Sequence, residues 1–386
     1  MIASALFAAS VGFVLYVLAG YPLLLGQYAK RFPKPIQKRP LYPTVTVIVP
    51  VRNGERWVKA KIRSLLASDY PADLLNVLIV SDGSTDRTEE LVESYPDARL
   101  ALLALPHGGK AIAVNCGLAQ ATGEIVLLTD VRQEFDAPAI ARLVACFADP
   151  TVGVVTGELV IREGTSIEEF QTGLYWRYEK WIRRNLNRID AMLGATGSIY
   201  AIRRELAAPL PPGTLLDDVH LPFAIAFKGY RIYFEDRAKA FDLPTSLHSE
   251  FWRKVRTQAG VYQILFRFPG LLWPGNRRFL HFASHKFGRL LLPLALLVAV
   301  VSSLDMPVPY KWLAISAQAG FYLLAALDPL LTEGIRLKRL TAVIRAFVVL
   351  VAAAACAVVV FFLPANRVWK ETRVERARSS EASVLH

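Results

Sequence analysis

Asn76-Val-Leu-Ile-Val-Ser-Asp82 and Glu124-Ile-Val-Leu-Leu-Thr-Asp130 are two short apolar runs that each end in an aspartate. A run that is apolar at consecutive positions is typical of a strand buried on both faces, as in a parallel sheet covered by helices. Ligands of such sheets bind in the crevice beyond the carboxyl ends of the strands. The two runs therefore predict a nucleotide site at which Asp82 and Asp130 face the nucleotide and a cation that balances its phosphates.

Strand and helix patterns alternate around these runs. We expect further strands at 43–50, 100–105 and 199–202, and helices at 56–66, 85–94, 111–119 and 219–227. This alternation predicts an α/β fold with a doubly wound, mostly parallel sheet. The domain that contains the sheet is expected to occupy residues 43–288.

Apolar residues are concentrated at both ends of this chain of 386 residues, which is 53% hydrophobic. Residues 2–25 carry no charge and are long enough to span a hydrocarbon core of roughly 30 Å. A cleaved signal peptide would have a basic segment before the apolar run, whereas here Lys30, Arg31 and Lys34 follow it. We therefore expect residues 1–28 to be a transmembrane anchor whose basic flank lies in the cytoplasm.

The C-terminal third predicts about three more spans within residues 289–364. Four simple spans would place the basic tail at 365–386 outside the cytoplasm, against the preference of basic segments for the inner side. A re-entrant segment or an exceptional tail would each resolve this conflict. The apolar segment near 261–273 is too short to span, and it predicts a helix at the membrane interface.

Charge and cysteine usage exclude other classes of function. The net charge of +12 lies largely beside the spans, where attraction to an anionic inner leaflet explains it, and no basic–aromatic module indicates nucleic-acid binding. Cys116, Cys146 and Cys356 have no paired spacing, so neither a disulfide framework nor a zinc site is expected.

Several motifs in the predicted sheet domain together resemble one enzyme family. In chain order they are Val49-Pro50 with Asn53, Ser81-Asp82-Gly83-Ser84, Gly109-Lys110-Ala111, Asp130, Gly194-Ala-Thr-Gly197, Leu216-Asp217-Asp218 and Arg253-Lys-Val-Arg256. Each motif alone is weak, since Asp-Gly-Ser is also a common turn. Together, over roughly residues 44–290, they resemble the family 2 glycosyltransferases of GT-A fold, and within them the membrane polysaccharide synthases of the hyaluronan, chitin and cellulose synthase type.

The resemblance implies a UDP-sugar donor and assigns the residues that bind its nucleotide. These residues are Pro50, Asn53, Asp82, Lys110, Asp130, Arg253 and Arg256. A diphosphate leaving group needs its charge neutralised, so we expect Mg²⁺ or Mn²⁺ with Asp130 as its principal ligand. The chain reads Asp130-Val131-Arg132 where the family has Asp-x-Asp, and Glu134 is the expected second metal ligand. Arg132 is an alternative source of positive charge.

The resemblance also assigns catalytic and acceptor residues. Asp218 matches the last residue of the family's Thr-Glu-Asp motif and is implied to be the general base, with Asp217 beside it raising its proton affinity. Both carboxylates could also cap the helix at 219–227. Arg256 takes the arginine position of the Gln-x-x-Arg-Trp motif, where a planar guanidinium suits a departing diphosphate. Gly194, Thr196 and Gly197 are expected to approach the acceptor, because small residues allow a sugar close to the backbone.

The sequence thus predicts a membrane-bound inverting glycosyltransferase of the cell (inner) membrane whose catalytic domain faces the cytoplasm. The acceptor would be a glycan or a lipid, in polysaccharide or glycolipid synthesis, and partner subunits of a secretion complex are possible. Arg253 and Thr257 stand where the family has Gln and Trp, which leaves repeated transfer open. These departures also motivate an alternative, a catalytically silent scaffold subunit of a polysaccharide synthase complex.

Overall fold

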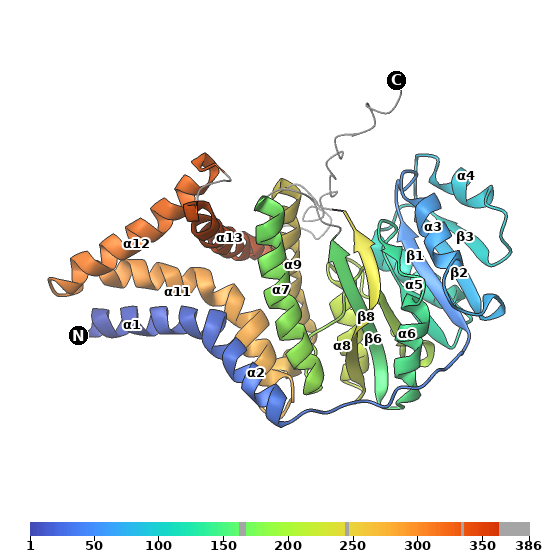
Figure 1. Ribbon diagram of the computed structural model, residues 1–386, viewed down its shortest axis with the longest axis horizontal. Coiled ribbons are helices and arrows are strands. Elements are labelled where there is room, and N and C mark those ends of the chain that lie inside the picture. Colours follow the sequence, from blue (N-terminus) through green and yellow to red (C-terminus); the bar gives the residue numbers. More distant parts are fainter. Residues whose placement is uncertain (162–166, 244–246, 333–335, 363–386) are drawn as a thin grey trace, which may run out of the picture.

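The computed structural model describes residues 1–161, 167–243, 247–332 and 336–362, and within them one eight-stranded sheet forms the centre of the molecule (Figure 1). The strands are β1 (Val45–Val51), β2 (Leu75–Asp82), β3 (Leu100–Leu105), β4 (Ile125–Leu128), β5 (Glu134–Phe135), β6 (Val152–Ile161), β7 (Tyr200–Arg203) and β8 (Arg231–Asp242). They lie in the order β3-β2-β1-β4-β7-β6-β8-β5.

The sheet is mixed and mostly parallel. Strands β3, β2, β1 and β4 are all parallel, and β6 is parallel to β8, whereas β7 runs antiparallel to both of its neighbours. Because β1, β2 and β4 are parallel neighbours, their carboxyl ends meet at one edge of the sheet. The predicted fold class is confirmed, and Asp82 and Asp130 lie at that edge.

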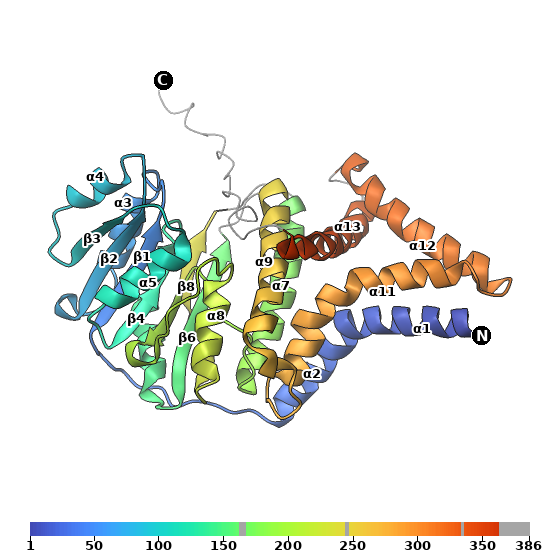
Figure 2. The same ribbon diagram turned by 180° about the vertical axis from the view of Figure 1, so that it is seen from behind.

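Helices cover both faces of the sheet, which explains the consecutive apolar residues of its strands. One face packs against α5 (Lys110–Gln120), α7 (Ile167–Arg188), α8 (Asp217–Ala226) and α9 (Leu247–Arg267), of which α5 and α8 lie in front of the sheet in Figure 2. The other face packs against α3 (Val58–Leu66), α4 (Thr88–Glu93) and α6 (Ala139–Ala145). In β1, Ile48 enters the first core, and Val47 and Val49 enter the second.

Four helical stretches in the described part of the chain are long and apolar enough to cross a membrane: Ile2–Arg31, Phe279–Ser303, Tyr310–Leu330 and Leu337–Phe361. They contain α1 (Ile2–Leu15), α2 (Tyr21–Arg31), α10 (Phe279–His281), α11 (Gly288–Ser303), α12 (Tyr310–Leu327) and α13 (Arg336–Cys356). Helices α1, α11 and α12 project to one side, away from the sheet, and α1 packs on α11 (Figure 1). These stretches agree with the expected N-terminal and C-terminal spans, and the basic tail at 365–386 lies outside the described residues.

The segment 261–273 is the end of α9 followed by a short turn at Pro269–Leu272. Val261 and Leu271 are buried in the core, whereas Phe266 and Trp273 remain 70% and 71% exposed. Residues 261–267 thus belong to the same helix, α9, that carries Arg256, and that helix ends at Arg267. That it lies at a membrane interface stays a prediction.

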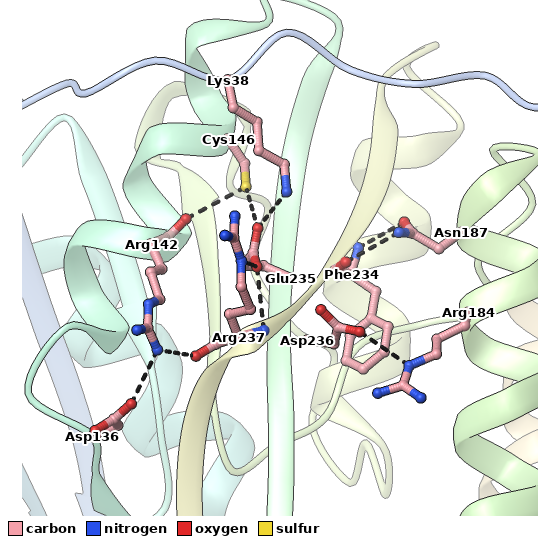
Figure 3. A network of polar contacts seen from close by, with 10 residues as sticks. All are labelled: Lys38, Asp136, Arg142, Cys146, Arg184, Asn187, Phe234, Glu235, Asp236 and Arg237. Atoms are coloured by element: carbon pink, nitrogen blue, oxygen red, sulfur yellow. Dashed lines mark hydrogen bonds and ion pairs between the residues drawn. The ribbon is translucent and has the colours of Figure 1, made fainter.

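The segment between α2 and β1 runs along the domain and is bonded to it at several points. The Lys34 backbone N–H donates to the carbonyl of Arg188 at 2.6 Å, at the end of α7. Lys38 pairs with Glu235, a buried carboxylate on β8 that the Cys146 thiol also contacts at 3.7 Å (Figure 3). These contacts attach the N-terminal helix to the sheet domain.

Candidate active site

A cavity of about 2420 Å³ opens at the carboxyl ends of the parallel strands and continues between the membrane helices. At the sheet edge, its walls include every residue that the sequence analysis assigned to the nucleotide, the acceptor and catalysis. These are Pro50, Asn53, Asp82, Lys110, Asp130, Gly194, Thr196, Gly197, Asp217, Asp218, Arg253 and Arg256. The structure thus brings together residues of β1, β2, α5, α8 and α9 and of the loops after β1, after β4 and before β7.

Asp82 organises the loop before α5. Its carboxylate accepts hydrogen bonds from the backbone N–H groups of Gly108 at 2.7 Å and Gly109 at 3.0 Å, and it contacts His107 Nδ1 at 3.0 Å. Gly109 has a φ of 91°, which a side chain would disfavour, so glycine is required for this approach. Asp82 therefore fixes the start of α5, and Lys110 is the first residue of that helix.

Asn53 holds the loop after β1 against the loop after β2. It has a φ of 51°, a conformation that asparagine tolerates better than most residues. Its Oδ1 accepts the Thr85 backbone N–H at 2.8 Å, and its own N–H donates to Ser84 Oγ at 3.1 Å. Two predicted nucleotide-binding segments are thereby joined at the cavity wall.

Lys110 bridges two carboxylates on different elements. Its ammonium lies 2.8 Å from Asp130 Oδ1 and 3.1 Å from Asp217 Oδ1. Burial disfavours its charge, but the two carboxylates outweigh burial and raise the pKa of Lys110 above its ordinary value. Burial likewise opposes the ionisation of Asp130, and Lys110 holds the pKa of Asp130 below its usual range. The pair therefore stays charged at neutral pH.

Asp218 is held at the first turn of α8 by the loop that precedes β7. Its Oδ2 accepts the Gly197 backbone N–H at 2.9 Å, and its carbonyl accepts the Ala195 N–H at 2.7 Å. Burial, and next the neighbouring Asp217, raise the pKa of Asp218 to about 6. A carboxylate of that pKa is suited to accept a proton near neutral pH.

Arg256 enters the site from α9. The side chain is partly buried, and the carboxylates of Asp130 and Asp218 lie within its electrostatic range. Arg253 also lines the cavity, one turn earlier on the helix. Arg132 donates instead to Asp242 Oδ2 at 2.7 Å, so its guanidinium is bound to the end of β8.

A lysine that the sequence analysis did not single out supports the Asp130 loop from inside. Lys61 on α3 is fully buried, and its ammonium donates to Thr129 Oγ1 at 2.7 Å and to the Gln133 carbonyl at 2.6 Å. Burial lowers the pKa of Lys61 to about 7. Lys61 therefore positions the turn that carries Asp130.

The donors available to a divalent cation are few. In the part of the chain that is described, no three His, Cys, Asp or Glu side chains form a metal-binding group. Asp130 is 42% exposed toward the cavity, and a Cβ at Gly197 would lie 3.7 Å from its Oδ2. This carboxylate fits a hard cation that the diphosphate of a donor would help to hold. Glu134 lies on β5 and is not among the residues that line the cavity.

The predicted acceptor loop packs on α8 and α7. Gly194 has a φ of 125°, and a Cβ there would lie 3.0 Å from Val219, so this position requires glycine. Thr196 Oγ1 accepts a hydrogen bond from Arg183 Nη1 at 3.2 Å. Arg183 is thereby placed at the cavity, although the sequence analysis did not include it.

Known proteins share this architecture and its motifs. Residues 46–209 match the family model described as Glycosyl transferase family 2. The fold matches a mannosyltransferase from Pyrobaculum calidifontis, solved with GDP-Man and Mn²⁺, with a TM-score of 0.69 and 27% identity, over 91% of this chain and 97% of that one. The chain therefore contains a glycosyltransferase domain that matches family 2 over residues 46–209.

Two curated relatives of this glycosyltransferase act on N-acetylglucosamine by name. It is 28% identical to the N-acetylglucosaminyltransferase of Rhizobium meliloti over 301 residues. The aligned region covers 72% of this chain and 70% of that one. It is 25% identical over 231 residues to the poly-beta-1,6-N-acetyl-D-glucosamine synthase of Staphylococcus aureus (strain COL), over 58% of this chain. The chain spans 56% of the length of that synthase. The glycosyltransferase thus resembles membrane polysaccharide synthases, as its motifs predicted.

Proposed function

We propose that this multi-pass membrane protein transfers a sugar, with inversion, from a nucleotide-sugar donor to a hydroxyl of a glycan or lipid acceptor. The observation that carries the proposal is the position of Asp218, which lines the cavity next to the buried Asp217 and within electrostatic range of Arg256. The residues proposed as the base, as the cationic groups for the leaving group and as the nucleotide-binding edge all line one cavity, which supports the proposal. The reaction would serve polysaccharide or glycolipid synthesis.

In the proposed reaction, Asp218 takes the proton from the acceptor hydroxyl. The oxygen then attacks the anomeric carbon of the donor sugar, while the bond from that carbon to the diphosphate breaks on the opposite face. The nucleoside diphosphate leaves, and the new glycosidic bond has the inverted configuration. The Gly197 N–H holds Asp218 in one orientation before and after the proton moves.

Positive groups would stabilise the negative charge that develops on the leaving diphosphate. Lys110 and Arg256 supply two fixed cations at the site. A Mg²⁺ or Mn²⁺ ion held by Asp130 would supply further charge neutralisation when bound. The mannosyltransferase of similar fold was solved with Mn²⁺, which supports a cation here.

The nucleotide is proposed to be UDP, from the resemblance of the nucleotide-binding motifs to those of UDP-dependent synthases. GDP-mannose is the second candidate, because the mannosyltransferase of similar fold binds GDP-Man. The base would lie among Pro50, Asn53 and Asp82, at the edge of the sheet.

The catalytic domain is proposed to face the cytoplasm of a cell (inner) membrane, where nucleotide sugars are made. The basic residues after the first span support this orientation, since such flanks favour the cytoplasmic side. Partner subunits of a secretion complex would be consistent with polysaccharide export.

Release of nucleoside diphosphate tests the proposal against the alternative of a silent scaffold subunit. The full chain would be purified in detergent and incubated with Mn²⁺ and a panel of UDP-sugars and GDP-mannose. An enzyme releases the diphosphate from at least one donor, faster with membrane lipids or oligosaccharides present. No release from any donor, with the protein folded and the nucleotide bound, would favour the scaffold.

A further inference from the structure

The cavity has a second half that the sugar donor does not need. Beyond the carboxylates it continues between the membrane helices, where its walls are mostly apolar. Gln318 and Arg345 also line it, and they are bonded to the Ala314 carbonyl and to Asp328. Val11 and Leu15 contribute from α1, Leu296 from α11, Phe321 from α12 and Leu350 from α13. The two halves form one continuous space, so a single molecule can reach Asp218 while part of it lies between the membrane helices.

Cations lie where the two halves meet. Arg183 on α7 and Lys286, just before α11, both line the cavity, and both are within electrostatic range of Asp218. Arg183 contacts the acceptor loop through Thr196. Two basic side chains therefore line the cavity near the proposed base.

The balance of charge at this junction is positive. Glu179 is the carboxylate beside these cations, and it is bound to Arg289 at 2.5 Å and to His285 Nε2 at 3.5 Å. Asp218 also lies in range of Arg183 and Lys286, and Glu158, in range of Arg183, is paired with Lys180 at 2.5 Å. Among the described residues at the junction, three cations, Arg183, Lys286 and Arg289, thus face two carboxylates, Glu179 and Asp218. A partly buried positive excess favours an anionic ligand, and guanidinium and ammonium groups suit a phosphate.

We propose that the acceptor of this enzyme is an anionic lipid whose phosphate lies at Arg183 and Lys286, whose chain lies between α1, α12 and α13, and whose hydroxyl-bearing head reaches Asp218. This inference rests on the proposed function, and it selects the lipid from the two acceptor classes. The mostly apolar walls match a hydrocarbon chain, whereas the hydroxyls of a growing glycan would pass Val11, Leu296 and Leu350, whose side chains offer no hydrogen bonds. The phosphate group would set the depth of the lipid, so that its hydroxyl meets the base.

Lipid binding can be measured without knowing the sugar. The full chain in detergent would be titrated with phytanyl phosphate, with phytanol and with inorganic phosphate, and bound ligand would be counted by native mass spectrometry. We expect phytanyl phosphate to bind about tenfold or more tightly than phytanol, the worth of one charge-assisted contact. Inorganic phosphate at millimolar concentration should not displace it. Equal binding of phytanyl phosphate and phytanol would overturn the proposal, and so would displacement by inorganic phosphate.

Matched variants locate the phosphate and the chain. Arg183→Gln with Lys286→Gln should remove the preference for phytanyl phosphate and leave phytanol binding unchanged. Arg184→Gln is the control, because Arg184 is the next residue on α7 and pairs with Asp236 away from the cavity (Figure 3). If the folded double variant still prefers phytanyl phosphate over phytanol, the phosphate does not lie at Arg183 and Lys286. If that variant does not fold, the comparison of the three probes on the unmodified chain still tests the proposal.

Ala317→Trp fills the apolar half and should weaken binding of both lipids, whereas Ala319→Trp on the same helix lies outside the cavity lining and should not. Equal effects of the two tryptophans would argue against a lipid chain between these helices.

Donor turnover by the same preparations separates the lipid acceptor from the proposed function. Selective lipid binding without release of nucleoside diphosphate would refute the proposed function, and release without selective lipid binding would refute the lipid acceptor.

Discussion

The Gly197 backbone N–H donates a 2.9 Å hydrogen bond to Asp218 Oδ2 and so connects the loop before β7 to the first turn of α8. The same loop lies beside Asp130, because a Cβ built on Gly197 would be 3.4 Å from Asp218 Oδ2 and 3.7 Å from Asp130 Oδ2. The carboxylate proposed as the base and the one proposed to hold a cation therefore face the same small volume. Acceptor hydroxyl and donor diphosphate have to meet there.

The pH dependence of transfer follows from Asp218. Burial and the charge of Asp217 raise its pKa to about 6, and the base must be ionised to accept a proton. The rate is therefore expected to be half-maximal near pH 6, to level off about one pH unit above that, and to approach a tenfold fall per pH unit well below it, as Asp218 becomes protonated. Initial rates between pH 4.5 and 8 check this. A rate that is unchanged down to pH 4.5 would exclude this group as the base.

Gly197→Ala tests the shared volume directly. The backbone there can accept alanine, and the added methyl would stand in ordinary contact with both carboxylates. We expect a folded protein with a melting temperature close to that of the unmodified chain and a transfer rate at least about tenfold lower, since small displacements of reacting groups are costly. Unchanged transfer would show that the acceptor does not pass between Asp130 and Asp218.

Arg256 and Arg253 form a matched pair on α9. They are three residues apart and line the same cavity, so a purely structural basic face would treat them alike. We expect Arg256→Ala to lower the transfer rate by about 10² or more, with a smaller effect on donor affinity, because its charge acts on the leaving diphosphate. Arg256→Lys should recover little, since a lysine lacks the planar fork. Small and equal effects of Arg253→Ala and Arg256→Ala on diphosphate release would remove Arg256 from catalysis.

Removal of divalent cations should abolish transfer. Asp130 is exposed to the cavity and offers a hard oxygen ligand beside the expected diphosphate. We expect excess EDTA to stop nucleoside diphosphate release and Mn²⁺ or Mg²⁺ to restore it, and Asp130→Asn to need a higher Mn²⁺ concentration. Full activity in EDTA would instead assign the charge neutralisation to Lys110 and Arg256.

The parallel half of the fold could be predicted because its signal is local. Strands such as β1 and β2 are buried on both faces, which makes their apolar residues consecutive and visible in the sequence. Strand β8 carries charged residues between its apolar ones, and the sequence analysis assigned no strand there. As a result, the bond between Arg132 and Asp242 at the end of β8 was not foreseen, and the role of Arg132 toward the diphosphate stays a prediction.

The site was predicted from motifs rather than from physics alone, and this determined what was missed. Asp218, Lys110 and Arg256 belong to recognisable motifs, and the structure places them at one cavity. Lys286 lies in the basic flank of a span, so its charge was attributed to membrane orientation. Lys61 lies in an amphipathic helix, where a lysine is normally solvated, and only the packed structure shows that it is buried. The sequence alone does not show that Lys286 lines the cavity or that Lys61 is buried.

The most direct measurement of the central claim compares Asp218→Asn with the unmodified chain and with Asp217→Asn. Asparagine keeps the size of Asp218 and can still accept the Gly197 N–H, but it cannot take a proton. If Asp218 is the base, this variant binds the donor nucleotide normally in a titration and transfers sugar about 10² or more times slower. A variant that binds the nucleotide and transfers at the normal rate would contradict the account, and a selective loss in Asp217→Asn would assign the base to that residue instead.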